Sequence, residues 1–244
     1  MCRDSGVLLH RNRRWVFFVN GTSEMTAESD VISQDFAFHR VISEISSLNW
    51  QDLTEEQVVD SAWAYYYFSV QFRENLQVTR FLLPDDPKIA DLEREECATD
   101  NLSPWPGVAA AGEAMDHDEF MRRTLLLAPI DRAKRERFQA LGERYLELTR
   151  SMDDATRALS IASYEDGGLE TVFRAMLRAP AYDNKLIAAF RHFLAEHIRF
   201  DSDPEAGHGA MSRHLRPDDR ILPLWQAFKQ LYVDFIGSGL RPAA

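Results

Sequence analysis

The 244-residue sequence predicts an all-α fold, a single compact helical bundle. Nearly every periodic segment spaces its apolar residues three and four positions apart, and no segment shows convincing alternation with a period of two. Apolar residues make up 45% of the chain and charged residues 27%, which is the balance of a globular protein. Since no repeat or low-complexity linker indicates a second domain, we expect one helical domain over residues 25–244.

The first 24 residues stand apart from this pattern. Three arginines (Arg11, Arg13 and Arg14) precede an apolar run from Trp15 to Val19, which is too short for the hydrophobic region of a signal peptide. Two alternatives stay open for residues 1–24: an extension without fixed structure, or a segment that docks on the helical body.

The first two helices are the easiest to place. One is expected over residues 31–46. The second should begin near Thr54, whose hydroxyl and the Gln57 side chain fit a capping box, and should run to about Leu83. The prolines of residues 84–87 then force a turn, because proline cannot donate a hydrogen bond in a helix interior.

The rest of the chain continues as helices separated by short breaks. A third helix is expected over residues 88–98, and residues 101–112, with Pro104, Pro106 and Gly107, predict a loop. Further helices are expected over residues 116–127, 131–150, 153–164, 169–177, 182–202 and 219–236.

Composition excludes several functions. The net charge of −11 argues against nucleic-acid binding, which needs clustered basic residues. No apolar run approaches the roughly 18 residues of a membrane span. With only Cys2 and Cys97, a disulfide scaffold and a thiolate zinc site are both excluded, and a cytoplasmic location is expected. A small-molecule or protein partner fits this composition best.

A cluster of candidate metal ligands lies near the end of the helix over residues 182–202. His197 and Asp201 are four residues apart, so their Cβ atoms should lie about 5–6 Å apart on one face, where one metal ion can take both. His208 would lie too far along a continuous helix, but Pro204 and Gly207 are residues that would break the helix and fold His208 back. The alternative for His197 and Asp201 is a structural hydrogen-bonded pair.

Further candidates come from the helices on either side of residues 84–87. Glu74 and Glu95 lie at similar distances from this turn, so an antiparallel hairpin would bring them level. Glu74 follows an aromatic stretch in which a buried carboxylate would need a metal or a cationic partner. Glu96 is the alternative to Glu95, because the sequence does not fix the register of this helix.

Two more candidates complete the set. Glu165 and His197 lie at similar distances on either side of Pro180, and His117 lies at the start of its own helix behind Asp116. Glutamate, aspartate and histidine side chains contributed by several helices suit iron or manganese in a helical bundle.

The order of these residues resembles the heme-oxygenase-like di-iron oxidases and oxygenases. The resemblance rests on a first glutamate, a Leu92-x-x-Glu95 motif, a histidine within residues 116–120, a central glutamate, and a final H-x3-D followed by a histidine, and it covers about residues 65–236. It implies a compact heme-oxygenase-like bundle with the metal ligands Glu74, Glu95, His117, Glu165, His197, Asp201 and His208. His214 is the alternative to His208.

The same resemblance implies two Fe(II) ions per chain, with O2 as co-substrate. The substrate is expected to be small and amino-acid-derived, and the reaction to be N-oxygenation or oxidative C–C cleavage in small-molecule biosynthesis. An external electron donor and a homodimer are compatible with this hypothesis. The alternatives are a mononuclear iron or manganese enzyme, a protein that binds heme or another ligand without redox chemistry, and a purely structural module.

Overall fold

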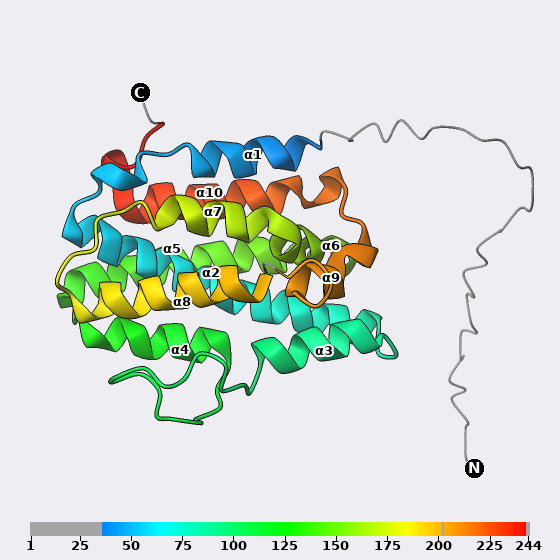
Figure 1. Ribbon diagram of the computed structural model, residues 1–244. Helices are drawn as coiled ribbons and strands as arrows, with labels where there is room; N and C mark the ends of the chain where they lie inside the picture. The colour runs from blue at the N-terminus through cyan, green and yellow to red at the C-terminus, as the bar shows by residue number, and fades with distance from the viewer. Residues whose placement is uncertain (1–35, 202, 243–244) are drawn as a thin grey trace, which may run out of the picture. The chain divides into compact units, whose positions relative to one another are not determined.

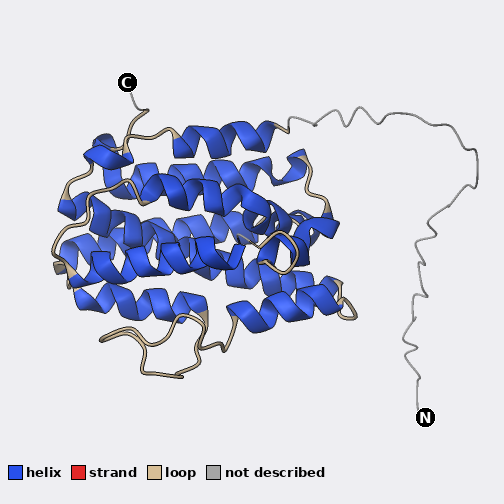
Figure 2. Cartoon of the chain, in the orientation of Figure 1, coloured by secondary structure: helices blue, strands red, loops and turns tan. Residues whose placement is uncertain are grey.

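The computed structural model describes residues 36–201 and 203–242, which form helices joined by turns and loops, with no β-strand among them (Figures 1 and 2). The prediction of an all-α fold is confirmed. The interpretation of residues 1–24 and the expected start of the first helix at residues 31–35 lie outside the described residues.

The long helix α2 (Glu55–Leu82) lies at the centre of this structure (Figure 1). Its first turn is closed by the predicted capping box, in which the Gln57 backbone donates to the Thr54 hydroxyl and the Thr54 backbone donates to the Gln57 side chain. Helices α4, α5, α6, α8 and α10 all pack against α2. Because it is covered on several sides, α2 buries residues around much of its circumference instead of along one stripe.

The remaining helices lie close to their predicted positions. The α-helices are α1 (Ala37–Ser46), α3 (Pro87–Glu96), α4 (His117–Thr124), α5 (Arg132–Arg150), α6 (Asp154–Ser163), α7 (Leu169–Met176), α8 (Lys185–Asp201), α9 (His208–Ser212) and α10 (Leu222–Ile236). Short 3₁₀ turns are η1 (Trp50–Asp52), η2 (Leu125–Leu127), η4 (Arg213–Leu215), η5 (Asp219–Ile221) and η6 (Gly237–Gly239). A π-helical segment, η3 (Tyr164–Gly168), joins α6 to α7.

The helix is interrupted between α8 and α9, at the point where Pro204 and Gly207 predicted a break. A side chain at Gly207 would lie 2.5 Å from the Asp203 carbonyl oxygen, so this tight reversal requires glycine. After the break α9 packs against α3 and η3, and His208, its first residue, is buried.

The loop between α3 and α4 is held by its own backbone. Thr99 and Met115 exchange two backbone hydrogen bonds, of 3.1 and 2.8 Å, and Trp105 pairs with Ala109 further out. The Thr99–Met115 pairing brings the end of α3 beside the start of α4. Glu96 and His117, which lie 21 positions apart in the sequence, can therefore meet.

Candidate metal centre

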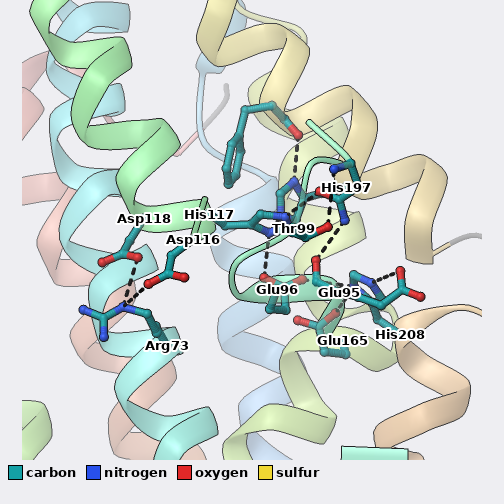
Figure 3. Close-up of polar contacts among 12 residues, drawn as sticks. Arg73, Glu95, Glu96, Thr99, Asp116, His117, Asp118, Glu165, His197 and His208 are labelled. Atoms are coloured by element: carbon teal, nitrogen blue, oxygen red, sulfur yellow. Dashed lines mark hydrogen bonds and ion pairs between the residues drawn. The ribbon is translucent and has the colours of Figure 1, made fainter. Parts of the chain in front are cut away.

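Five elements converge on one buried group of polar side chains: the end of α3, the start of α4, the π segment η3, the last turns of α8 and the start of α9 (Figure 3). Such burial is unusual for carboxylates and imidazoles, which favour water unless they are paired or bind a metal. The side chains are at most 6% exposed; they are Glu96, His117, Glu165, His197, Asp201 and His208.

Helix α3 supplies Glu96 because of its helical register. Ile89 and Leu92 are both fully buried, and Glu96 follows them at the i+7 and i+4 positions, on the same face of the helix. Glu95 is rotated by about 100° from that face, and its side chain is 47% exposed.

The histidines His117 and His197 face each other across the cluster. The distance from His117 Nδ1 to His197 Nε2 is 3.0 Å, and that from His117 Nδ1 to Glu96 Oε2 is 2.7 Å. The outer ring nitrogens are held by oxygen acceptors: His117 Nε2 lies 2.9 Å from Asn101 Oδ1, and His197 Nδ1 lies 2.8 Å from the Phe193 carbonyl oxygen.

These outer contacts determine where the protons lie. An oxygen acceptor requires an N–H, so neutral His197 carries its proton on Nδ1 and directs the lone pair of Nε2 toward His117. His117 faces an oxygen at both nitrogens, Asn101 Oδ1 at Nε2 and Glu96 Oε2 at Nδ1. The orientation of Asn101 is fixed in turn, because its amide nitrogen donates to the Glu95 carbonyl oxygen at 2.8 Å. Either a proton on His117 Nδ1 or a metal ion in its place satisfies both Glu96 Oε2 and the lone pair of His197 Nε2, and histidines whose outer nitrogens are held in this way are typical of metal sites.

His208 forms the second half of the cluster. Its Nδ1 lies 3.1 Å from Glu165 Oε2, 3.2 Å from Glu96 Oε1 and 3.3 Å from Asp201 Oδ1. Its Nε2 lies 3.6 Å from Glu95 Oε2. One imidazole therefore faces three buried carboxylates, which it cannot neutralise alone.

The pKa values reflect this excess of negative charge. Burial raises the pKa of Glu165 to about 8, with the neighbouring Asp201 carboxylate adding to the effect, and burial also raises the pKa of Asp201. For His208, burial lowers the pKa, but the hydrogen bonds to Asp201 and Glu165 outweigh burial and raise it well above the usual value.

The first half of the cluster behaves differently. Burial alone would raise the pKa of Glu96, but the His117 imidazole reverses this and the pKa is lowered to about 2. Burial, together with His117, lowers the pKa of His197 to about 3. At neutral pH Glu96 is thus a carboxylate and His197 a neutral imidazole, which are the forms that bind metal ions.

The donor atoms fall into two overlapping groups. Glu96, His117 and His197 form one group and Glu96, Glu165 and His208 form the other, and in each group the ligand atoms lie within 4.8 Å of one another. Within the cluster, three buried atoms make no hydrogen bond with a described residue; they are Glu96 Oε1, Asp201 Oδ1 and His208 Nε2. Both oxygens face the single His208 Nδ1 atom, at 3.2 and 3.3 Å. Buried carboxylate and imidazole atoms without hydrogen bonds are costly unless a cation satisfies them, so these residues fit a metal site.

A small cavity adjoins the cluster on the side of α2. Its free volume is about 20 Å³, which is room for about one water molecule. Besides four residues of the cluster, the cavity is lined by Tyr65, Ser69, Phe72, Arg73, Asp118, Leu169 and Phe193.

The structure brings five of the seven sequence-predicted ligands together; these are His117, Glu165, His197, Asp201 and His208. Glu74 lies elsewhere, because the face of α2 toward the cluster carries Ser69 and Phe72. The Glu74 carboxylate instead makes a two-pronged contact with Arg150, at 2.8 and 2.5 Å. The sequence indicated that this carboxylate needs a metal or a cation, and the structure supplies the cation.

Glu95 is the second correction. It reaches the cluster only through the 3.6 Å contact with His208, and the alternative, Glu96, occupies the central position. The spacing of Ile89, Leu92 and Glu96 was the signal in the sequence that could have shown this. His214, the alternative to His208, lies outside the cluster and contacts Asp86 at 2.7 Å.

Sequence reasoning missed Asn101, which orients His117 from within a loop, and no local pattern marks it. Comparison of the chain with protein-family models, with curated proteins and with solved structures found no match. Among the described helices, none combines the length and the apolarity needed to cross a membrane. The site itself therefore has to carry the functional argument.

Proposed function

We propose that this protein is a non-heme di-iron oxygenase or oxidase that uses O2 to oxidise a small, amino-acid-derived substrate. The observation that carries the proposal is the position of Glu96, which is shared between two buried His/carboxylate groups. A carboxylate with one oxygen toward each group suits a bridge between two metal ions, as in other helical-bundle metal centres. The donors are nitrogen and oxygen atoms only, a set that suits iron or manganese.

The six residues divide naturally between two ions. His117 and His197 would hold the first, while Glu165, Asp201 and His208 would hold the second, with Glu96 common to both. When bound, the two Fe(II) ions supply the electrons that reduce O2 and so make oxidation of the substrate possible.

The chain's own residues prepare the site for these ions. Asn101 and the Phe193 carbonyl hold the two imidazole rings with one nitrogen inward, so binding does not have to reorient them. Phe72, Leu169 and Phe193 line the cavity and limit the access of water to the reacting centre. Glu95 Oε2 lies 3.6 Å from His208 Nε2, so after a small movement it can accept a hydrogen bond from this nitrogen.

The finer points of the proposal follow from the resemblance. They are N-oxygenation or oxidative C–C cleavage as the reaction, an external electron donor, and the cytoplasm as the location. A homodimer is compatible with the proposal but is not required, because all six residues come from one chain.

A mononuclear enzyme is the second candidate, and one observation favours it. Glu96, His117 and His197 alone form a set of two histidines and one carboxylate, which is the ligand set of many single-iron oxygenases. In that case His208 would remain an imidazolium that pairs with Glu165 and Asp201 without a metal.

Anaerobic Fe(II) titration with a metal count, followed by rapid mixing with O2 and visible absorption spectroscopy, tests the proposal. Wild-type protein is expected to bind about two irons per chain and to show a transient absorption band with O2. Glu96→Gln should lose both ions, because it removes the shared ligand. Glu74→Gln is the matched control, and it should retain both ions because Glu74 pairs with Arg150 away from the cluster.

The other outcomes separate the candidates. One iron per chain, insensitive to Glu165→Gln, would support the mononuclear enzyme. A folded wild-type protein that binds no iron, or a His197→Ala variant with full activity, would overturn both. Full activity of Asp201→Ala would overturn the di-iron enzyme alone.

A further inference from the structure

The cavity beside the cluster contains one cationic side chain, Arg73. It lies on the face of α2 that also carries Tyr65, Ser69 and Phe72, and its side chain is 28% exposed. Arg73 Nε donates to Asp118 Oδ1 at 3.0 Å, and Asp116 Oδ2 lies 3.9 Å from the same nitrogen. The terminal nitrogens of the guanidinium make no hydrogen bond with any described residue.

The contact with Asp118 therefore holds the guanidinium in place and leaves its two terminal NH2 groups available. Two parallel N–H groups of an arginine match the two oxygens of a carboxylate. Figure 3 shows Arg73 with Asp116 and Asp118 on one side of His117, and Glu96, Glu165 and His208 on the other. Arg73 thus lies near the cluster without belonging to it.

A second donor lies in the same cavity. The Tyr65 side chain is 2% exposed, and its hydroxyl makes no hydrogen bond with another residue of the described chain. Burial raises the pKa of Tyr65 well above the usual value, so the hydroxyl keeps its proton and can donate a hydrogen bond to an acceptor. Most of the remaining wall is apolar and consists of Phe72, Leu169 and Phe193.

We propose that Arg73 binds the carboxylate of a small carboxylic acid, the substrate of the proposed di-iron enzyme, on which this inference rests. Arg73 is 28% exposed at the open end of the cavity and Glu165 is 3% exposed at the closed end. The carbon chain would lie along Phe72, Leu169 and Phe193 toward the cluster, and these side chains would have to move apart to make room for it. Oxidation would then occur at a position of the substrate remote from its carboxylate.

Calorimetric titration of the Mn(II)-loaded protein with butanoate and with its neutral isostere butanamide tests this assignment. Manganese replaces iron so that no turnover occurs, and its uptake is measured on the same samples. Butanoate is expected to bind at least about tenfold more tightly than butanamide, since a charged hydrogen bond contributes about 1.5–3 kcal/mol. Arg73→Gln should remove this preference, and Arg73→Lys should restore part of it.

Arg150→Gln is the control, because it removes a carboxylate-paired arginine outside the cavity, where Arg150 contacts Glu74. It should leave the preference unchanged. Equal affinity for both probes, or a preference for butanoate that survives in Arg73→Gln, would overturn the assignment; the latter means that the metal ions alone capture the carboxylate.

Failure of the proposed function is seen separately. If wild-type protein takes up no Mn(II), the di-iron proposal fails, and the same titration of the metal-free protein decides on Arg73. A preference for butanoate that depends on Arg73 then supports an anion site, and the lack of one overturns it.

Discussion

The tautomer of His117 depends on two side chains, Asn101 at Nε2 and Glu96 at Nδ1. The Oδ1 atom of Asn101 faces His117 Nε2 because its amide nitrogen is occupied by the Glu95 carbonyl. Without this acceptor the proton could move to Nδ1, the atom that faces Glu96 and His197. A loop residue therefore controls whether a ligand nitrogen is available.

Asn101→Ala should weaken metal binding about tenfold or more, as is typical when a residue that orients a metal-bound histidine is lost. The measurement is a competition titration with a chelator and Mn(II). Asp100→Asn, in the same loop and exposed, is expected to bind like wild type. Unchanged affinity in Asn101→Ala would show that the His117 ring is held by its packing alone.

Glu74 and Arg150 illustrate a contact that stabilises without a role in the site. Glu74→Gln should lower the free energy of unfolding by about 1 kcal/mol or less, because Arg150 is 49% exposed and solvent screens the pair. Urea denaturation measures this. A loss well above 1 kcal/mol would mean that the contact of Glu74 with Arg157, at 4.0 Å, contributes to stability as well.

The sequence predicted the residue types of the metal ligands better than their positions. The choice between Glu95 and Glu96 is one residue, yet on a helix one residue is a rotation of about 100°. Glu74 is a different case. Its need for a partner was evident from its aromatic surroundings, but the partner, Arg150, is 76 positions away in the sequence and is set by the packing of α5 on α2.

The π segment η3 is the element on which Glu165 depends. The sequence predicted that one helix ends near residue 164 and another begins at residue 169, with Gly167 and Gly168 between them. The structure joins them through one wide turn in which Gly167 has a φ of +88°, a conformation that favours glycine. Such turns are frequent at functional sites, and no helical periodicity predicts them.

Gly168→Ala should disturb this turn, because a Cβ atom there would lie 2.0 Å from the Ser163 carbonyl oxygen and 2.8 Å from Trp225 Cζ2. We expect a loss of about 1–3 kcal/mol in the free energy of unfolding and a drop from about two metal ions per chain to one, since Glu165 belongs to one of the two groups. Metal counting and thermal denaturation measure both effects.

Gly112→Ala is the control for Gly168→Ala. Gly112 also has a positive φ, of +72°, but a Cβ atom there meets nothing within 4 Å. It should cost about 1 kcal/mol of backbone strain without changing the metal count. If Gly168→Ala keeps two ions, the geometry of η3 is not what places Glu165.

For the whole molecule, the sequence was sufficient for the helices and for the break before α9, because Pro204 and Gly207 act locally. It was insufficient for the way five elements meet. The pairing of Thr99 with Met115, which brings Glu96 to His117, joins residues that carry no mark of it in the sequence. Contacts between distant segments depend on how the helices pack. The residue types of the candidate centre could therefore be predicted from the sequence, but the way these residues meet could not.

The stability of the metal-free protein should fall as the pH rises from about 6.5 to 8. Burial raises the pKa of Glu165 from 4.5 to about 8, so over this range the folded chain holds a proton that the unfolded chain has released, and the pKa of His208 is raised in the same direction. His197, with its pKa lowered from 6.5 to about 3, and Glu96, with its pKa lowered to about 2, affect stability only at lower pH.

Metal ions displace the protons of Glu165 and His208, so the difference in Tm between Mn(II)-loaded and metal-free protein should widen from pH 6.5 to 8. Glu165→Gln should flatten the metal-free profile, which separates the effect of this group from the general repulsion of a chain of net charge −11. A metal-free Tm that stays level or rises between pH 6.5 and 8 would contradict the assignment of a protonated cluster.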